Sequence, residues 1–355
     1  MTTEAALPPL RTPNGAPADT FDVALLDLDG VVYLGRDPVP GAAAALSGAR
    51  EAGMRLAFVT NNASRTPEEV VTLLDEVGVK AEVEEVVTSA QAAGRLLAER
   101  LPAGARVLVV GAEALRREVR ARGMVPVSTA EEEPSGVVCG YSPDISWRHL
   151  AEATVAVRRG AYWLATNADL TLPSTRGPLP GNGSLVGVVA TATGQRPEVA
   201  GKPDPALHQE SVDRTAARRP LVVGDLLATD IEGANRACCA SLLVLSGVTT
   251  PATLLTASPL HRPTFLAADV GGLLLEHRAV QVDGVVHRCG RWRAQRTADG
   301  VVLALESAAV GGGDRLDALR ALCVAVWSAA DDSASTSVTS GDADAATLLG
   351  EWGVA

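Results

Sequence analysis

The chain has 355 residues, a length that predicts two or three domains. Hydrophobic residues make up 47% and charged residues 21%, which excludes a globally disordered chain. With 42 acidic against 31 basic residues the formal net charge is −11, so the composition favours neither a nucleic-acid partner nor an anionic membrane, because both need clustered basic residues.

The first 20 residues hold several prolines, an early glutamate and no apolar stretch typical of a signal peptide. We therefore expect a disordered leader over residues 1–20. No run in the sequence approaches the roughly 18–20 apolar residues of a membrane span, so we expect a cytoplasmic protein. The cysteines lack the spacing of a disulfide framework or a zinc site and are interpreted as buried thiols: Cys139, Cys238, Cys239, Cys289 and Cys323.

Strands and helices alternate from Phe21 onward. The apolar runs at 21–29 and 54–60 each predict a buried strand that ends in polar residues, with a helix between them. Thr66, followed by a proline and two glutamates, predicts the start of a second helix. Similar alternation continues over residues 105–247. This order predicts an α/β fold with a Rossmann-like parallel sheet and right-handed crossovers.

The pattern changes after about Pro251. Residues 261–274 are interpreted as a closing helical segment. Residues 279–305 alternate with a period of two and contain Asp-Gly turns, as antiparallel hairpins do, and a helix follows at 314–330. We expect a separate small α+β domain in this part of the chain.

Carboxylates follow two of the predicted strands. Asp27 and Asp29 project to the same face, at the strand end where open α/β sheets bind ligands. Asp225 follows another apolar run, and Asp230 lies near the start of the next helix. A hard divalent cation such as Mg²⁺ would relieve the repulsion between these groups. Taken singly, each aspartate also fits an ordinary turn or helix cap.

Two further segments suit a phosphate group. Thr60, Asn61 and Asn62 end the second predicted strand with short uncharged donors, although an Asx turn would use the same residues. Lys202 lies between a glycine and a proline, where a chain reversal can bring its ammonium to a fixed point. The alternative for Lys202 is an ordinary solvated surface lysine.

The strings DLDGV, TNN, GKP and GDLLATD, in this order, resemble the four motifs of the haloacid dehalogenase-like hydrolase superfamily. The longer strings DLDGVVYLG, TNNASRTPEEV, ATNADLTLPSTRGPLPGNGSLVGVV and GDLLATDIEGANRA resemble its subfamily IIA. This subfamily has a large α/β cap and includes NagD-type nucleotidases, 4-nitrophenylphosphatases and phosphoglycolate phosphatases. The resemblance covers Asp22 to Gly247. It implies a catalytic core at 21–88 and 197–273, a cap at 89–196 and the α+β domain at 278–355.

The resemblance implies a phosphatase in which Asp27 attacks phosphorus and forms an aspartyl phosphate. Asp29 would protonate the leaving alcohol and later deprotonate the hydrolytic water. Mg²⁺ would bind Asp27, the main-chain carbonyl of Asp29 and Asp225, with Asp230 supporting the waters of the metal. Thr60, with Asn61, would hold the phosphoryl oxygens, and Lys202 would neutralise the nucleophile and the transferred group. The expected substrate-binding residues are Gly30, Asn61, Asn62, Asn167, Asp169 and Arg176.

Differences within the motifs bear on the substrate. The fourth motif commonly has Arg and Asp where this chain has Leu226 and Ala228, which leaves Asp225 and Asp230 in place. Pyridoxal phosphate phosphatases place a histidine before the proline of the cap string, whereas Leu172 precedes Pro173 here, which favours a small aliphatic phosphate. The extra domain resembles the truncated acetyltransferase-like tail of bacterial glycerol 3-phosphate phosphatases.

We therefore expect a small-molecule phosphate ester as the partner, with glycerol 3-phosphate foremost. Phosphoglycolate, a nucleotide monophosphate and an aryl phosphate remain alternatives. A homodimer through the cap is one assembly that the resemblance allows. Gly311–Gly313 precede a helix and could cradle a pyrophosphate, which leaves a bifunctional phosphatase–acetyltransferase open, but the acetyl-CoA pattern is absent, and we expect a non-catalytic domain. A ligand-binding protein on an inactive phosphatase fold is disfavoured because the ionisable groups of the motifs are intact.

Overall fold

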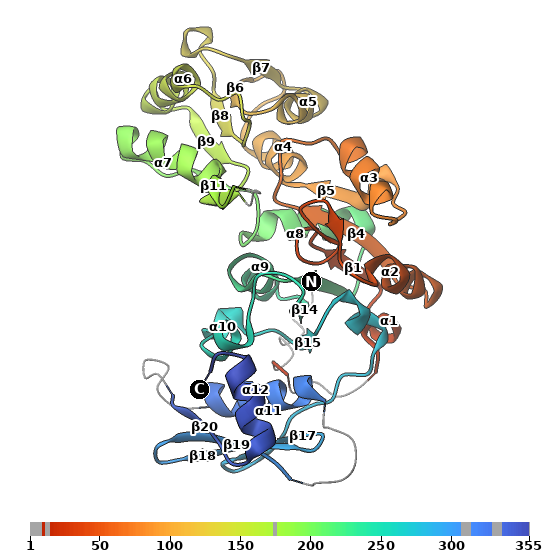
Figure 1. Ribbon diagram of the computed structural model, residues 1–355. Helices are drawn as coiled ribbons and strands as arrows, with labels where there is room; N and C mark the ends of the chain where they lie inside the picture. The colour runs from red at the N-terminus through yellow and green to blue at the C-terminus, as the bar shows by residue number, and fades with distance from the viewer. Residues whose placement is uncertain (1–8, 11–14, 173–175, 307–313, 329–335, 355) are drawn as a thin grey trace. The chain divides into compact units, whose positions relative to one another are not determined.

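The computed structural model describes residues 9–10, 15–172, 176–306, 314–328 and 336–354 (Figure 1). The chain divides into two compact units. Unit 1 comprises residues 1–34, 38–56 and 218–355, and unit 2 comprises residues 35–37 and 57–217. Pro173 and the Gly311–Gly313 loop lie outside the described residues. The predicted boundaries of core, cap and tail stay predictions.

Unit 1 contains a parallel sheet with the strand order β15-β14-β13-β1. Its strands are runs of buried Val, Leu and Ala, the composition that parallel sheets require. The strands are β1 (Val23–Leu26), β13 (Pro220–Gly224), β14 (Ala240–Val244) and β15 (Phe265–Ala267). The helices are α1 (Pro17–Thr20), α2 (Ala42–Glu51), the π-helix η3 (Leu227–Ile231), α9 (Glu232–Arg236), α10 (Pro251–Leu255), and the 3-10 turns η4 (Pro259–His261) and η5 (Val270–Leu274). The short strands β2 (Tyr33–Leu34) and β3 (Asp37–Pro38) follow β1.

Two sequence-based expectations differ from the structure of unit 1. The closing helix expected over 261–274 is wrong, because Phe265–Ala267 form the buried strand β15, paired in parallel with Leu242–Val244. Within the expected disordered leader, Pro17–Thr20 form α1 and Leu10 is buried. Two backbone hydrogen bonds hold Leu10. Its amide donates to the Thr264 carbonyl, and its carbonyl accepts from the Val280 amide. Apolar burial and these two hydrogen bonds order this part of the leader.

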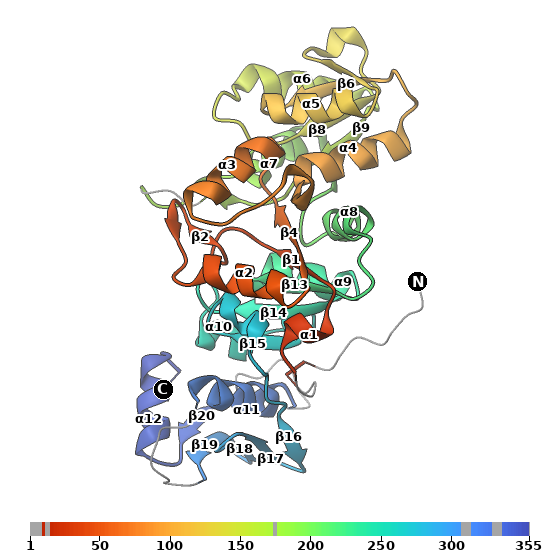
Figure 2. The same ribbon diagram turned by 90° about the vertical axis from the view of Figure 1, so that its right-hand side faces the viewer.

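The C-terminal part of unit 1 is a five-stranded sheet with the order β16-β17-β18-β19-β20, antiparallel except for the parallel pair β19 and β20. This confirms the predicted α+β domain with hairpins. Helix α11 packs on the face of this sheet and also contacts α10 and β15 (Figure 2). The elements are β16 (Gln281–Asp283), β17 (Val286–Cys289), β18 (Trp292–Thr297), β19 (Gly300–Leu305), α11 (Arg315–Trp327), β20 (Val338–Ser340) and α12 (Ala343–Glu351).

Unit 2 contains a second parallel sheet with the order β12-β9-β8-β6-β7. Strand β4 (Arg55–Thr60) enters the unit at Ala57 and pairs in parallel with β5 (Val86–Thr88). The other strands are β6 (Arg106–Val110), β7 (Val125–Val127), β8 (Gly136–Cys139), β9 (Tyr162–Ala165), β10 (Thr171–Leu172), β11 (Leu179–Pro180) and β12 (Glu198–Val199). The helices are α3 (Pro67–Glu76), η1 (Val83–Glu85), α4 (Ser89–Arg100), α5 (Glu113–Ala121), η2 (Ala130–Glu132), α6 (Trp147–Arg158), α7 (Asn182–Thr193) and α8 (Pro205–Thr215).

The start of α3 shows how closely a local signal can fix an element. Thr66 Oγ1 accepts a hydrogen bond from the Glu69 amide at 3.3 Å, and Glu69 Oε2 accepts one from the Thr66 amide at 2.7 Å. Pro67 occupies the first turn. This capping box satisfies two backbone donors at the helix N-terminus and confirms the predicted start at Thr66.

Three general expectations can be compared with the described residues. All five cysteines are free thiols, but Cys238 is exposed and Cys239 half-buried, which corrects the expectation of burial for these two. Cys238 has φ +54° in the turn after α9, where its side chain leaves the core.

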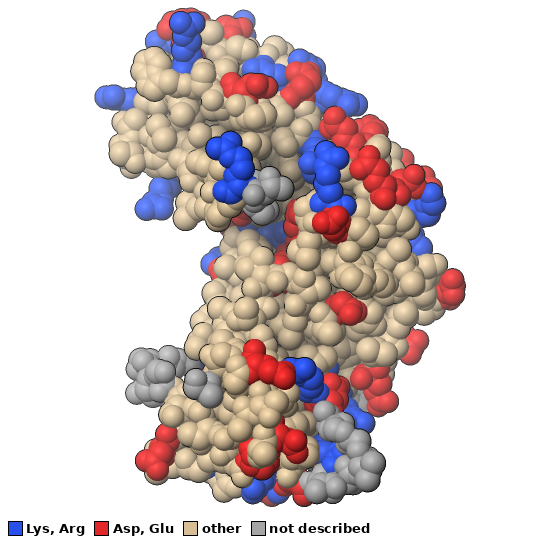
Figure 3. Space-filling model, in the orientation of Figure 1, with Lys and Arg blue, Asp and Glu red and all other residues tan. Residues whose placement is uncertain are grey.

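Among the described residues no helix combines the length and hydropathy needed to cross a bilayer. Acidic and basic side chains are interspersed on the face shown in Figure 3.

Candidate active site

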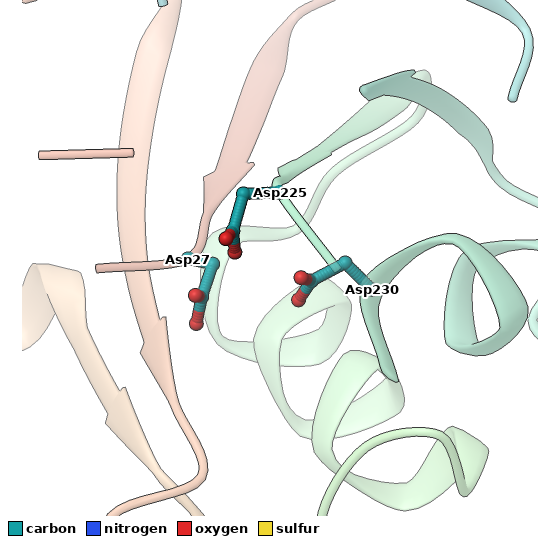
Figure 4. Close-up of side chains that lie close together, drawn as sticks. All are labelled: Asp27, Asp225 and Asp230. Atoms are coloured by element: carbon teal, nitrogen blue, oxygen red, sulfur yellow. The ribbon is translucent and has the colours of Figure 1, made fainter. Parts of the chain in front are cut away.

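Three aspartates of unit 1 meet at the carboxyl ends of two adjacent strands. Asp27 follows β1 and Asp225 follows β13, and these strands pair in parallel with Leu26 opposite Val223. Asp230 comes from η3. One carboxylate oxygen from each of the three residues lies within 4.8 Å of the others (Figure 4). Asp225 and Asp230 are buried and Asp27 is half-buried.

The cluster depends on glycines that leave room for the carboxylates. A Cβ atom on Gly30 or on Gly247 would collide with the carboxylate of Asp225, and one on Gly224 would collide with Asp230. Gly30 also has φ +80°, a backbone conformation that favours glycine. The close approach of these backbones therefore packs the buried acids.

Backbone amides orient the two buried acids. The Val248 amide donates to Asp225 Oδ2 at 2.6 Å, and the Leu226 amide donates to Asp230 Oδ2 at 3.1 Å. Three carboxylates this close repel one another unless a cation lies between them. An oxygen-only donor set of this kind fits Mg²⁺, which prefers carboxylates, waters and phosphate oxygens.

The second predicted group of site residues lies in unit 2. Thr60 ends β4, is buried, and accepts a hydrogen bond from the Asn62 amide at 3.1 Å. Asn62 Oδ1 accepts hydrogen bonds from the Ser64 amide and hydroxyl at 2.8 and 2.7 Å. The Asn62 side chain therefore stabilises the turn after β4, which is the Asx-turn alternative left open above.

Asn61 and Lys202 are held together. Asn61 Oδ1 accepts from the Lys202 amide at 2.8 Å, while Asn61 Nδ2 donates to the Lys202 carbonyl at 3.1 Å. Asn61 Nδ2 also donates to the Asp169 carboxylate at 3.2 Å. Lys202 is only 3% exposed, and its ammonium donates to the Val59 carbonyl at 3.5 Å, so it is not a solvated surface lysine.

The expected cap residues have different surroundings. Asn167 is buried and donates to the Asn61 carbonyl at 2.7 Å, and its Oδ1 accepts from the Asp169 amide at 3.2 Å. Arg176 is exposed between β10 and β11. Asp29 is exposed beyond β1, and Gly30 next to it is buried.

The structure thus brings the predicted residues together in two sets. Asp27, Asp225 and Asp230 form the carboxylate cluster of unit 1. Thr60 and Asn62 form a turn of unit 2, and there Asn61 is joined by hydrogen bonds to the predicted residues Lys202, Asn167 and Asp169. The Ser89 hydroxyl also donates to the Asn61 carbonyl, at 2.6 Å.

Gly247 and Asn182 were not among the site residues predicted from the sequence. Gly247 lies against Asp225, and buried Asn182 donates to the Asn167 carbonyl at 2.8 Å. The signal available for Asn182 was its position between two glycines in the Gly-Asn-Gly string at 181–183.

Comparison with known proteins identifies the family. A model described as haloacid dehalogenase-like hydrolase matches residues 24–125, and one described as HAD-hydrolase-like matches residues 199–273. The chain is 48% identical over 315 residues to a D-glycerol 3-phosphate phosphatase of Mycobacterium tuberculosis, covering 88% of this chain and 87% of that protein. The chain belongs to the haloacid dehalogenase-like hydrolases. The two matched segments hold Asp27 in the first and Lys202, Asp225 and Asp230 in the second.

Other members of the family and their structures agree with this assignment. An acid sugar phosphatase of Staphylococcus saprophyticus is 37% identical, covering 65% of this chain and 88% of that one. The crystal structure of a glycerol phosphate phosphatase from M. tuberculosis in complex with magnesium has a TM-score of 0.88 at 44% identity, covering 96% and 99% of the two chains. A 4-nitrophenylphosphatase from Thermotoga maritima has a TM-score of 0.68 at 31% identity, covering 73% and 98%.

The C-terminal domain has its own match. A model described as GCN5-related N-acetyltransferase like domain matches residues 289–354, which confirms the predicted resemblance to an acetyltransferase fold. The carboxylate cluster of Asp27, Asp225 and Asp230 fits a hard divalent cation, and the M. tuberculosis glycerol phosphate phosphatase was crystallised in complex with magnesium.

Proposed function

We propose that the chain is a Mg²⁺-dependent phosphatase that hydrolyses glycerol 3-phosphate to glycerol and phosphate. The observation that carries the proposal is the carboxylate cluster of Asp27, Asp225 and Asp230 at the ends of two adjacent parallel strands. Support for the substrate comes from the M. tuberculosis relative, which is named as a D-glycerol 3-phosphate phosphatase and is matched along most of its length.

In the proposed reaction Asp27 attacks the phosphorus atom, the bond to the glycerol oxygen breaks, and an aspartyl phosphate forms. Asp29 gives its proton to the leaving oxygen and then takes one from the water that hydrolyses the aspartyl phosphate. A carboxylate nucleophile thereby divides the hydrolysis into two easier steps. The exposed position of Asp29 suits a group that must exchange protons with solvent. When bound, Mg²⁺ supplies positive charge for the phosphoryl oxygens and the nucleophile.

The remaining residues of the motifs are proposed to hold the phosphoryl group. Thr60 would donate its hydroxyl hydrogen to a phosphoryl oxygen, and Gly30 and Asn62 remain proposed substrate-binding residues. The Lys202 ammonium would neutralise charge on the transferred group. Phosphoryl transfer depends chiefly on such positioning and charge stabilisation. We also retain the Asp29 main-chain carbonyl as a proposed metal ligand.

The choice among phosphate esters is proposed from the cap. Leu172 supplies an aliphatic side chain where pyridoxal phosphate phosphatases have a histidine, which favours a small aliphatic ester over an aromatic one. Arg176, Asn167 and Asp169 are the proposed substrate contacts there. A cytoplasmic location and a homodimer through the cap belong to the same proposal.

A substrate profile of the purified full-length protein with Mg²⁺ tests the proposal. We expect glycerol 3-phosphate to give a higher kcat/KM than phosphoglycolate, nucleotide monophosphates and 4-nitrophenyl phosphate. Chelation of the metal should stop phosphate release, and Asp27→Asn should lose nearly all activity. A profile in which glycerol 3-phosphate ranks far below the other esters would refute the substrate assignment.

The acetyltransferase-like domain is proposed to be non-catalytic. Its shared core with the parallel sheet of unit 1 supports a structural role. Calorimetric titration of the full-length protein with acetyl-CoA should show no binding heat. Heat together with acetyl transfer would instead favour a bifunctional enzyme.

A further inference from the structure

Three asparagines of unit 2 form a chain of hydrogen bonds that ends at Lys202. Asn182 Nδ2 donates to the Asn167 carbonyl at 2.8 Å, and Asn167 Nδ2 donates to the Asn61 carbonyl at 2.7 Å. Asn61 then pairs with the Lys202 main chain in both directions, at 2.8 and 3.1 Å. Each link joins the side chain of one residue to the main chain of the next. This series of hydrogen bonds therefore fixes backbone positions from the start of α7 to Lys202.

These links lie where water cannot easily replace them. Asn182 is 1% exposed, Asn167 5% and Lys202 3%. A buried carbonyl that loses its only amide donor keeps the full cost of desolvation, so the backbone must shift to find another partner. Removing Asn182 takes the 2.8 Å donor from the Asn167 carbonyl. The Cys139 carbonyl, to which Asn182 Nδ2 also donates at 3.3 Å, keeps its hydrogen bond from the Thr166 amide at 2.8 Å.

Glycines make the close approach possible. A Cβ on Gly201 would lie 2.6 Å from Asn61 Oδ1 and 2.6 Å from the Thr166 carbonyl oxygen. A Cβ on Gly183 would collide with the Ala168 carbonyl. The backbone at Gly201 and at Gly183 is thus packed too tightly against its neighbours for any side chain there.

The Asn61 amide is fully engaged by protein groups. Its Nδ2 hydrogens are directed to the Lys202 carbonyl and to the Asp169 carboxylate, and its Oδ1 accepts from the Lys202 amide. These contacts orient the main chain at Lys202 and leave the side chain of Asn61 no spare donor for a phosphoryl oxygen.

We propose that Asn182, Asn167 and Asn61 are positioning residues that hold Lys202 at the phosphoryl-binding position. This inference rests on the proposed function, in which the Lys202 ammonium stabilises the transferred group. A lysine ammonium acts as a point charge, so a small displacement weakens its interaction with the transition state. Because that charge acts mainly as the transition state forms, displacement lowers kcat more than it raises KM.

A double-mutant cycle on the full-length protein tests the proposal, with Mg²⁺ and glycerol 3-phosphate as substrate. The four proteins are the wild type, Asn182→Ala, Lys202→Ala and the double variant. We expect Asn182→Ala to lower kcat roughly ten- to a hundredfold. In the Lys202→Ala background the same substitution should lower kcat less than twofold, roughly, because there is no longer an ammonium to position.

Asn235→Ala is the matched control. Asn235 Nδ2 also donates to two backbone carbonyls, those of Leu260 at 2.7 Å and Arg262 at 3.2 Å, but it belongs to unit 1 and to none of the four short motifs. Its removal should leave kcat unchanged. Asn182→Asp, which keeps the volume of the side chain and replaces the donor by an acceptor, gives a second cycle with the same expected result, and thermal unfolding of every variant checks that it is folded.

The outcomes separate the inference from the proposed function. If Lys202→Ala lowers kcat to a small but measurable value and Asn182→Ala lowers kcat by the same factor in both backgrounds, the proposed function stands and the positioning role is overturned. If Lys202→Ala retains full kcat, the proposed role of Lys202 fails, and the inference fails with it.

Discussion

Two glycines, Gly30 and Gly247, leave the space that the Asp225 carboxylate occupies. We predict that Gly247→Ala lowers kcat by roughly a hundredfold or more, since its new methyl group must displace the Asp225 carboxylate from the cluster. Phosphate release at saturating Mg²⁺ and calorimetric titration with Mg²⁺ measure the two consequences. Full activity together with unaltered Mg²⁺ affinity would contradict the geometry described here.

Gly187→Ala is the control for this substitution. Gly187 lies inside α7, and a Cβ there meets no atom within 4 Å. Because glycine in a helix interior costs up to about 1 kcal/mol relative to alanine, the variant should be equally active and as stable or slightly more stable.

Residues whose function follows from their place on a strand could be predicted from the sequence. Asp27 and Asp225 each follow an apolar run, and adjacent parallel strands bring such positions to one edge. Gly247 and Asn182 could not be predicted in this way, because their importance depends on the groups that approach them, the Asp225 carboxylate for Gly247 and the Asn167 carbonyl for Asn182. For the same reason the sequence suggested a phosphate contact for the Asn61 side chain, whose hydrogen bonds to Lys202 and Asp169 only a structure can reveal.

At the scale of elements, helices α4, α5 and α8 of unit 2 are joined through one buried glutamate. Glu210 on α8 forms ion pairs with Arg95 of α4 at 3.4 Å, Arg122 at the end of α5 at 3.1 Å and Arg214 of α8 at 2.7 Å. The Glu210 side chain is 7% exposed, whereas the three arginine side chains are 29–31% exposed, so solvent screens part of the attraction.

We predict that Glu210→Gln lowers the free energy of unfolding by about 1–3 kcal/mol, because three guanidinium groups lose their shared carboxylate. Denaturant unfolding followed by circular dichroism measures the change. Glu113→Gln removes the partner of Arg120 in an exposed pair and should change stability by less than about 1 kcal/mol. If the two substitutions lowered the free energy of unfolding equally, burial of Glu210 would add nothing to stability.

The turn after η5 carries a histidine whose protonation opposes folding. Burial lowers the pKa of His277 below its ordinary value of 6.5; the hydrogen bond to the Gly272 carbonyl opposes this shift, and the Arg320 charge adds to it. His277 also packs edge-on against Phe265, with ring centroids 5.2 Å apart. The folded protein therefore favours the neutral ring, with Nε2–H donating to Gly272.

The pKa of His277 is lower in the folded protein than in the unfolded chain. The unfolded chain therefore binds more protons in the window below pH 6.5. Stability contributed by the neutral ring is complete above this window and decreases as the pH falls through it. We predict that His277→Gln, which can still donate to Gly272, reduces the loss of unfolding free energy between about pH 7 and about pH 5. The free energy of unfolding of each protein is measured by denaturant titration at both pH values. An equal loss in the wild type and the variant would contradict this assignment.

Elements were predictable where the signal is local. The capping box at Thr66 fixed the start of α3, and the period of two fixed the C-terminal hairpins. Strand β15 was mistaken for part of a helix, because its three residues are too few to show a period. What makes Phe265–Ala267 a strand is pairing with β14, a contact that lies outside the segment itself.

At the scale of the whole molecule, the C-terminal domain and the parallel sheet of unit 1 share one hydrophobic core. Leu319 and Leu322 of α11 belong to the same buried cluster as Leu254, Leu255 and Leu266. Polar contacts reinforce it: Arg320 donates to the Leu266 carbonyl at 2.7 Å, and the Trp327 indole donates to the Leu255 carbonyl at 3.2 Å. A separate domain boundary read from sequence composition does not reveal such a shared core.

A shared core predicts that the two parts unfold together. Leu322 is fully buried, and Leu322→Ala should lower stability by about 2–5 kcal/mol, because the cavity left behind adds to the lost burial. We expect heat inactivation of phosphatase activity and the loss of near-ultraviolet circular dichroism to shift to lower temperature by the same amount. Leu260→Ala, at a leucine that is 47% exposed, should shift neither. If the dichroism shifts while the inactivation temperature stays constant, the C-terminal domain unfolds independently, and its core does not support the parallel sheet on which Asp27 and Asp225 are placed.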